Sequence, residues 1–399
     1  KSGEFTKVLK DLGLFNKLDL RECPDLVAKL SGQDHHFAGQ GRLRMMMDIL
    51  LKTDVSTSDK GKLAAAAGKE MMGKKLMNAF RIGTSGKDKN AYSMTVRDWL
   101  NQYTDDKQVH ELFDSFCAGY AMAREWELPA GELFGVMAKT AGMTDVWMAV
   151  HGNITIVNEL ANVVRENGDM WDNAPVKEIV MKGKQVHSVI VEHDGKDEEI
   201  ECNICISDIG PKETVAITGT EHFGDDYMKE CRVKLRPHPF VFVFIASDIP
   251  LCAKEGQHCT YMVTGARRIQ GCVPMTNTCP ELAPEGQHFL YVVGEPQSSL
   301  LPFDEEHEKK LIMEDIHEFF PDFDKHGRII DYEPRNIDHD LPEGRTWQTI
   351  SYFVPRETPI KNMFMVGDAC QSPGLIGTSG CAAGAMDVVS IIKKKFKPA

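Results

Sequence analysis

The sequence predicts an α/β protein in which two domains are interleaved along one chain. Three observations indicate this fold: helical spacing of apolar residues before residue 141, strand-like alternation over 176–207, and a closing strand, glycine-rich loop and helix. A chain of 399 residues with 42% hydrophobic residues can bury the cores that two domains need. We expect residues 1–150 to be mainly helical and residues 216–358 to form a sheet. The second domain is expected to combine a middle segment, 151–215, with a closing strand and helix, 359–399.

Composition and charge narrow the classes of function. The formal net charge of −13 argues against a general nucleic-acid binder, because such proteins need a basic surface. The longest apolar run, 240–246, is far too short to span a bilayer and predicts a strand buried on both faces. The 11 cysteines are more typical of reduced thiols in a cytosol than of a secreted disulfide scaffold, so we expect a cytoplasmic protein.

The first part of the chain shows mostly helical spacing. We expect residues 1–80 to be mainly helical, and the segment 93–100 has the pattern of a capped helix start. Helical spacing continues over 109–116, and we expect Gly119 to end that helix. A further helix is expected over 131–141.

The remaining segments alternate between the two periods. A helix over 156–164 is expected to stop at Asn167-Gly168. An antiparallel meander follows, with glycine turns between strands over 176–181, 185–192 and 199–207. We expect a helix over 304–319, a closing strand and helix over 362–366 and 379–395, and further strands over 240–246, 260–263, 289–293 and 349–354.

The closing stretch combines features that suit a ligand. Gly374, Gly377 and Gly380 give the freedom that lets backbone N–H groups approach an anion at a helix N-terminus. Asp368, directly after the strand, can accept hydrogen bonds from the hydroxyl groups of a ligand. On spacing alone, an ordinary strand–helix junction that binds nothing explains the pattern equally well, because glycine-rich turns are common.

The closing stretch NMFMVGDACQSPGLIGTSGCAAGAM (362–386) resembles the C-terminal flavin motif of FAD-dependent oxidoreductases of the phytoene desaturase and amine oxidase kind. Residues 151–191 are similar to the central segment of that family, and 205–219 to its return into the substrate domain. The segment 95–120 fits the helical region before them. The resemblance implies a discontinuous, Rossmann-like FAD-binding domain of the GR2 type and a substrate domain of mostly antiparallel sheet with covering helices.

The resemblance implies FAD as the cofactor and assigns cofactor-binding residues near the C-terminus. Gly367 and Asp368 match the Gly-Asp pair that lies against the pyrophosphate and the ribityl chain. Gly377, Thr378 and Gly380 match the helix start that faces the pyrimidine end of the flavin ring. Under this assignment, positive dipole at the helix start would stabilise the anionic end of a reduced flavin.

Two more cofactor-side residues follow from the resemblance, and no catalytic residue does. Val176 matches the valine whose backbone contacts the adenine side. Gly152 lies in a segment that passes near the cofactor, where the family has Gly-Gly and this chain has His151-Gly152. A histidine there could put a proton donor near the ring, but a surface substitution is the simpler interpretation. Since the flavin carries the hydride chemistry, the absence of an acid–base constellation is expected.

The larger departure from the family is its first motif, a strand, G-x-G-x-x-G and helix that hold the pyrophosphate. The sequence contains no G-x-G-x-x-G, and its nearest match, Gly83 to Gly86, lacks the spacing. Because the sequence opens at Lys1 without methionine, we expect that the unit and any targeting signal lie ahead of it. A second polypeptide that supplies the unit, and a relative that has lost the cofactor, are the alternatives.

The cysteines and methionines predict packing more than chemistry, and no metal site is expected. We place Cys202 and Cys205 on one strand, where residues three apart point to opposite faces and cannot share an ion. Metal pairs usually have two to four residues between them, unlike the gaps among Cys252, Cys259, Cys272 and Cys279. An apolar channel or ordinary core filling would explain the methionines at positions 45–47, 71, 72 and 77.

We therefore expect an FAD-dependent oxidoreductase similar to phytoene dehydrogenase, which transfers hydride between a C–C bond of a hydrophobic substrate and the flavin. A C–N bond is the less favoured target. An isoprenoid is one candidate substrate, and peripheral membrane contact and a partner redox protein stay open. Two alternatives are a flavin-free relative that binds prenyl or other apolar ligands, such as the prenyl-protein chaperones, and a subunit of a larger redox complex.

Overall fold

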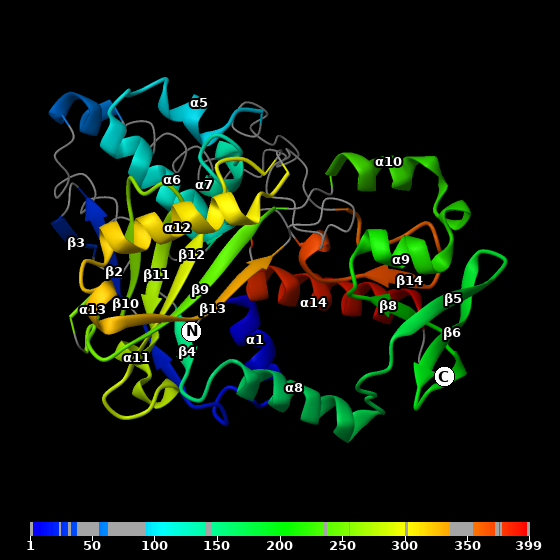
Figure 1. Ribbon diagram of the computed structural model, residues 1–399. Coiled ribbons are helices and arrows are strands. Elements are labelled where there is room, and N and C mark those ends of the chain that lie inside the picture. The colour runs from blue at the N-terminus through cyan, green and yellow to red at the C-terminus, as the bar shows by residue number, and fades with distance from the viewer. Residues whose placement is uncertain are drawn as a thin grey trace.

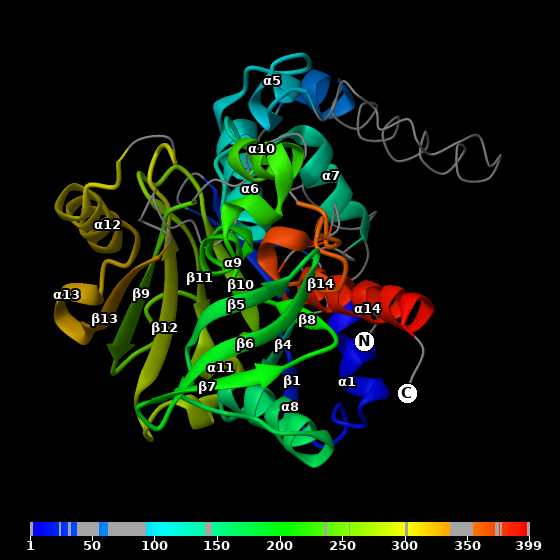
Figure 2. The same cartoon turned by 90° about the vertical axis from the view of Figure 1, so that its right-hand side faces the viewer.

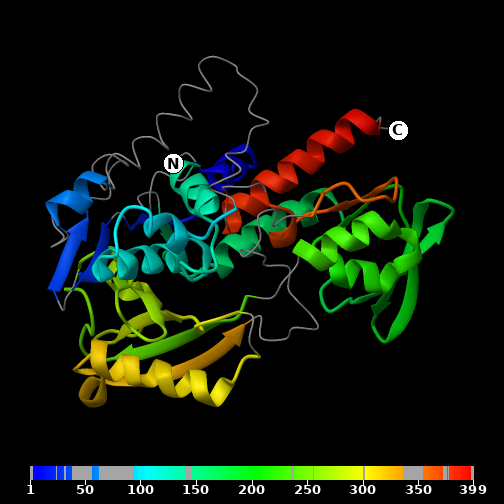
Figure 3. The same ribbon diagram turned by 90° about the horizontal axis from the view of Figure 1, so that it is seen from above.

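A computed structural model describes residues 3–23, 25–30, 33–37, 56–62, 93–139, 146–234, 238–254, 256–299, 302–335, 354–371, 375 and 377–396. The molecule has two parts (Figure 1). One is built around a large sheet with helices on its faces. The other contains a smaller antiparallel meander, which lies at the opposite end of the molecule when seen from above (Figure 3).

The large sheet has seven strands in the described part of the chain, in the order β13-β9-β12-β11-β10-β2-β3. All neighbours are antiparallel except β10 and β2, which run parallel. The mostly antiparallel sheet expected for this part is confirmed. Its strands are β2 (Asp25–Leu30), β3 (Gln33–Phe37), β9 (Phe240–Ser247), β10 (Cys259–Val263), β11 (Ile269–Pro274), β12 (His288–Gly294) and β13 (Gly327–Arg335).

Helices cover the two faces of this sheet unequally. On one face, α12 (Glu305–Phe319) buries Ile312 and Ile316 against Val243, Ile245 and other strand residues. On the other face, α5 (Val96–Leu100), α6 (Lys107–Ala121) and α7 (Ala130–Lys139) form a core with Leu26 and Ala28 of β2 and with Met262 of β10. These three helices lie over the β2–β10 side of the sheet, which leaves the β9–β12–β13 side for other contacts.

The sequence prediction was wrong for part of the first 80 residues. Besides α1 (Glu4–Asp11), the chain forms β1 (Leu20–Glu22), β2 and β3 there. Strand β2 pairs with β10, more than 200 positions away, and its residues Leu26, Val27 and Ala28 are buried on alternating faces. Because this strand is stabilised by a distant partner and packed on both faces, its local apolar spacing does not distinguish it from a helix.

The second part of the molecule holds the meander and a short parallel sheet (Figure 2). The meander is confirmed as β5 (Val176–Lys182), β6 (Gln185–His193) and β7 (Lys196–Glu201). The parallel pair is β8 (Cys205–Ser207) with β14 (Met363–Met365), flanked by α9 (Pro211–Thr218) and α14 (Gly377–Lys395). Helices α1 and α14 pack side by side.

Shorter elements connect these parts. Strand β4 (Trp147–Ala149) pairs with β1, and α8 (Ile154–Asn167) follows it. The turn at η1 (Thr220–His222) leads to α10 (Gly224–Lys234). Near the sheet lie α11 (Met275–Thr278), η2 (Pro280–Leu282) and α13 (Phe323–His326). None of the helices in the described ranges has both the length and the apolar character needed to cross a bilayer.

Helix ends follow the sequence signals with one exception. Thr95 caps α5 in a capping box with Asp98, and α8 stops at Gly168. Gly119, however, does not end α6, which continues to Ala121 and stops where Met122 adopts a φ of 48°. The helix absorbs Gly119 because a single glycine costs only about 1 kcal/mol there, less than the surrounding packing supplies.

Three strand predictions also need comment. The single strand expected over 199–207 is two, because the chain leaves the meander after Glu201 and joins β14 at Cys205. Strands β11 and β13 were not predicted. The strand expected over 349–354, the methionines at 45–47, 71, 72 and 77, and the segment 83–86 lie outside the described residues, apart from Val354.

Candidate functional site

Two strands far apart in the sequence bring their carboxyl ends to one place. Strand β14 runs parallel to β8, with Met365 opposite Ser207, and the amide of Val366 donates to the carbonyl oxygen of Ser207 at 3.0 Å. All three residues of β14 are buried, at 0%, 1% and 0% exposure. The residues that follow the two strands, Asp208 and Gly367, therefore lie together at the carboxyl edge, where open α/β sheets bind ligands.

Gly367 is required at this edge for two reasons. Its backbone has φ 88° and ψ −166°, a region that only glycine populates readily. A Cβ on Gly367 would also collide with Oδ1 of Asp208. The chain therefore turns sharply out of β14 with the Asp208 carboxyl against its backbone, and the next residue, Asp368, begins the short η3 helix (Asp368–Cys370).

The two carboxyl groups, Asp208 and Asp368, make an acidic edge. Burial, and then the negative charge of Asp368, raise the pKa of Asp208 above its usual range. Oδ1 of Asp368 accepts hydrogen bonds from Nε2 of Gln371 and from the thiol of Cys381, the latter at 3.3 Å. Burial and the Asp368 carboxylate raise the pKa of Cys381 to about 12, so its thiol stays protonated as a donor.

Gln371 connects this edge to α14. Its side chain is only 2% exposed, and its Oε1 is buried without a hydrogen-bond partner among the described residues. A Cβ on Gly380 would collide with that Oε1, so the glycine makes room for the amide. One turn later, a Cβ on Gly384 would lie 3.5 Å from the carbonyl oxygen of Cys370. The small residues of α14 thus let the helix approach the loop closely.

The first turn of α14 lies near this region, because α14 packs against η3. Gly377 begins the helix with φ 51°, Thr378 is exposed, and Ser379 lies near Gly3 at the start of α1. The first four N–H groups of a helix have no partner within the helix, and its N-terminus carries a partial positive charge. An acceptor-rich or anionic group would therefore be stabilised at this turn.

The β8 side is held in place by α9. Gly210 has φ 88°, and Pro211 starts α9 directly after it. The hydroxyl groups of Ser207 and Thr214 are 2.6 Å apart, and Thr214 also donates to the carbonyl oxygen of Gly210 at 2.7 Å. These bonds fix the loop that carries Asp208.

The structure joins some of the predicted residues and leaves others apart. Gly367, Asp368 and Gly380 meet through Gln371, and Gly377 and Thr378 belong to the same helix start. Val176 opens β5 opposite Val191 and is 40% exposed. Val176 therefore belongs to the meander, a different sheet from the β8–β14 pair.

Gly152 and His151 lie beside the large sheet. Gly152 has φ 86°, and a Cβ on it would lie 3.9 Å from Cδ2 of Leu282 in η2. His151 is exposed. Its exposed position fits the surface substitution that we favoured from the sequence.

Sequence reasoning missed Asp208, Gln371 and Cys381. A signal existed for Asp208, which directly follows an apolar strand just as Asp368 does. That signal was hidden because the expected strand ran as one piece over 199–207. Nothing in the sequence could show that Gln371 and Cys381 reach Asp368, since both depend on how α14 packs.

Two statements about cysteines are corrected or refined. Cys202 and Cys205 do not alternate along one strand, and both pack against the same apolar cluster as Met363. Cys259 and Cys272 belong to the core beneath α12, with Sγ of Cys272 3.8 Å from Sγ of Cys252, whereas Cys279 packs in a separate cluster. Desolvation raises the pKa of Cys205 to about 11, as expected for thiols in a core.

The fold is similar to that of several oxidoreductases of known structure. The chain matches no protein-family model, and no curated protein matches its sequence. An oxidoreductase from Methanosarcina mazei is 19% identical over 97% of this chain and 85% of its own, with a TM-score of 0.75. Putrescine oxidase bound to putrescine is 14% identical over 98% and 86%, with a TM-score of 0.65. Cyclohexylamine oxidase from Brevibacterium oxydans is 11% identical over 99% and 86%, with a TM-score of 0.64. The chain has the fold of these oxidoreductases.

The residues at the carboxyl edge suit a ligand with hydroxyl groups and an acceptor-rich end. Asp208 and Asp368 present carboxyl oxygens, which accept hydrogen bonds from hydroxyls. The first turn of α14 has N–H groups without partners inside the helix, and Oε1 of Gln371, which has no hydrogen-bond partner among the described residues, is a further acceptor. A flavin with a ribityl chain carries both kinds of group, so the site's chemistry fits it.

Proposed function

We propose that the chain is an FAD-dependent oxidoreductase, or the larger part of one, that transfers hydride between a C–C bond of a hydrophobic substrate and the flavin. The observation that carries this proposal is the meeting of Gly367, Asp368 and Asp208 beside the start of α14. The fold shared with known oxidoreductases supports it.

Each residue has a defined part in this proposal. Asp368 would hold hydroxyl groups of the ribityl chain, and Gly367 would keep the backbone clear for it. The N–H groups at Gly377 and Thr378 would stabilise negative charge on the ring through the helix dipole. When bound, the flavin supplies hydride transfer at its N5 atom. Val176 and Gly152 remain proposed cofactor contacts from the family resemblance.

The aromatic face of the large sheet is evidence for an apolar substrate. Phe242 and Phe244 of β9 and Phe289 and Tyr291 of β12 share the face opposite α12, and each is only partly buried. The ring centroids of Phe242 and Tyr291 are 4.9 Å apart, and those of Phe244 and Tyr291 5.5 Å. A continuous aromatic surface of this kind contributes apolar area to a bound hydrocarbon.

The absorption spectrum of the protein purified from its native source tests the proposal. Flavin bands that survive dialysis are the expected result. A spectrum without them would contradict the proposal and favour the flavin-free relative that binds apolar ligands. Flavin bands seen only while a second protein co-purifies would favour the subunit of a larger redox complex.

A further inference from the structure

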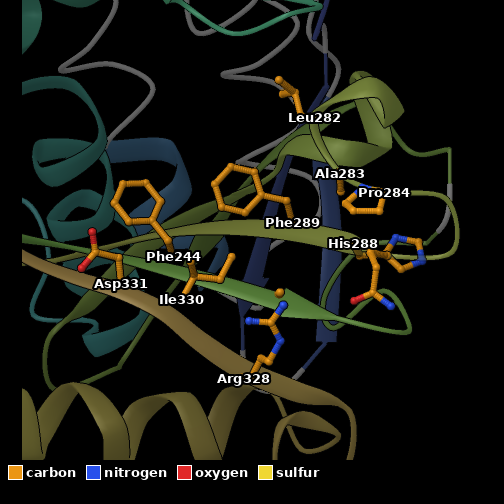
Figure 4. Close-up of a pocket in the computed structure, with 11 residues that line it drawn as sticks. Phe244, Leu282, Ala283, Pro284, His288, Phe289, Arg328, Ile330 and Asp331 are labelled. Atoms are coloured by element: carbon orange, nitrogen blue, oxygen red, sulfur yellow. The ribbon is translucent and has the colours of Figure 1, made fainter.

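A pocket of about 370 Å³ lies on the aromatic face of the large sheet, where β9, β12 and β13 meet η2. Its floor is formed by Phe244 and Phe289, whose rings stack at a centroid distance of 6.0 Å and an interplanar angle of 22°. Leu282 and Pro284 form a wall. Figure 4 shows the two rings side by side, projecting from the strands that carry them, on the same side of the strands as Leu282. The volume is within the range of small-molecule sites.

The pocket carries positive charge at one end. Arg328 of β13 lies opposite Ala246 in the strand register, and His288 of β12 lies opposite Ser247. Both residues line the pocket, but the register puts the Arg328 side chain on the face of Phe244 and the His288 side chain on the face of Ile245. The Arg328 side chain makes no hydrogen bond or ion pair with any other residue that the structure describes. An arginine next to an apolar floor, without a carboxylate partner among the described residues, is suited to an anionic ligand.

Among the described residues that line the pocket, Asp331 carries a carboxylate. Asp331 is opposite Phe244, two positions along β9 from Ala246, so the backbones at Asp331 and Arg328 are roughly 7 Å apart along the strand. Oδ1 of Asp331 accepts the backbone N–H of Tyr332 at 2.8 Å. No ion pair joins Asp331 and Arg328 among the described residues, so Arg328 is available to a ligand.

We propose that this pocket binds a flat, apolar molecule with one anionic group, such as an aromatic carboxylate. The rings of Phe244 and Phe289 stack against the apolar part, and Arg328 pairs with the carboxylate. A Cβ on Gly152, a proposed cofactor-side residue, would lie 3.9 Å from Cδ2 of the wall residue Leu282, so the two residues are near neighbours. The idea that this ligand is the substrate rests on the proposed function. Binding of the ligand to the pocket does not depend on that function.

A matched pair of probes tests the charge preference. We expect 2-naphthoate to bind the protein at least tenfold more tightly than the neutral 2-naphthamide, measured by titration calorimetry. The net charge of −13 repels anions in general, so a preference for the anion has to come from a local cation. Equal affinities, or tighter binding of the amide, would overturn the proposal.

Two arginine variants locate the preference. Arg328→Gln is expected to remove the advantage of 2-naphthoate and leave 2-naphthamide binding within about twofold. Arg335→Gln, on the same strand but outside the pocket and paired with Glu333, is the control and should bind both probes as the unaltered protein does. An unchanged preference in Arg328→Gln, or an equal loss in Arg335→Gln, would overturn the assignment.

The flavin spectrum of the same preparations separates this inference from the proposed function. Flavin bands without a preference for 2-naphthoate would overturn the pocket inference alone. A preference for 2-naphthoate that depends on Arg328, in protein without flavin bands, would overturn the proposed function alone.

Discussion

At the scale of single residues, the glycines at the carboxyl edge make room for polar side chains. From the sequence we expected Gly377 and Gly380 to let the backbone approach an anion. The structure adds that Gly380 makes room for Gln371, and Gly367 for Asp208. The place of Gly367 and Asp368 just after a buried strand could be predicted, because the apolar run before them is short and ends at a glycine. The neighbours that fill the space could not, because they come from packing between distant segments.

Substitution of Gly367 tests this reading. Gly367→Ala would place a methyl group on Oδ1 of Asp208 in a backbone region that alanine avoids. We expect the free energy of unfolding in urea to fall by roughly 2–4 kcal/mol, from strain plus overpacking, and bound flavin to be lost. Gly195→Ala, at a φ of 73° with nothing within 4 Å, is the control and should cost about 1 kcal/mol. An equal loss of unfolding free energy in Gly367→Ala and Gly195→Ala would contradict the close contact between Gly367 and Asp208.

His151 gives a second test at this scale. The side chain is exposed, so His151→Gly should leave the flavin content unchanged and alter turnover less than tenfold. Turnover and absorbance of the purified variant measure both quantities. A hundredfold loss, about 2.7 kcal/mol on the barrier, would instead make His151 a participant in the reaction.

At the scale of elements, long periodic segments could be predicted and strands with distant partners could not. Helices α12 and α14 and the meander β5–β7 have strong local patterns and glycine or capping signals at their ends. Strands β2 and β3 do not, because their place in the sheet depends on β10. The break between β7 and β8 could not be predicted either, because β8 pairs with the distant strand β14 and not with the meander.

A buried polar cluster holds α6 and the loop after it against the segment that follows β12. Arg124 pairs with Asp114 at 3.0 Å, and Glu127 accepts the amide of Ser299 at 3.0 Å. Glu295 is 1% exposed, and neither of its carboxyl oxygens has a hydrogen-bond partner among the described residues. Burial raises the pKa of Glu295 to about 8, and the nearby carboxylates of Asp114 and Glu127 add to the rise while Arg124 opposes it.

This cluster predicts a pH dependence of stability. Between pH 4.5 and pH 8 the unfolded chain has lost the proton of Glu295 while the folded protein keeps it, so stability from this group is full below pH 4.5 and lost as pH rises. The loss is about 1.4 kcal/mol per pH unit at most. Glu295→Gln should therefore gain stability relative to the unaltered protein from pH 5 to pH 8 in urea unfolding. Glu166→Gln, at an exposed position, is the control. Parallel pH profiles for Glu295→Gln and the unaltered protein would contradict a protonated Glu295.

At the scale of the whole molecule, the proposed site combines segments near residues 208 and 368, which the pairing of β8 with β14 brings together. Among the described residues β8 pairs only with β14, and Ile206 and Ile209 near its edge are 50% and 54% exposed. Parallel sheets usually have more strands and covered faces. The strand–GxGxxG–helix unit expected from the family resemblance stays a prediction, and the parallel sheet is where it would join.

The central claim is that the carboxyl edge of β8 and β14 holds a flavin. Titration of FAD into protein expressed from the whole gene tests it most directly, with Asp368→Ala compared with Asp387→Ala. Asp387 lies later in α14, is 57% exposed and pairs with Arg356, so its loss should leave the affinity for FAD unchanged. Asp368→Ala removes a charge-assisted acceptor worth roughly 1.5–3 kcal/mol, and the affinity should fall about tenfold to a hundredfold. Equal affinities of the two variants for FAD would contradict the site at Gly367 and Asp368.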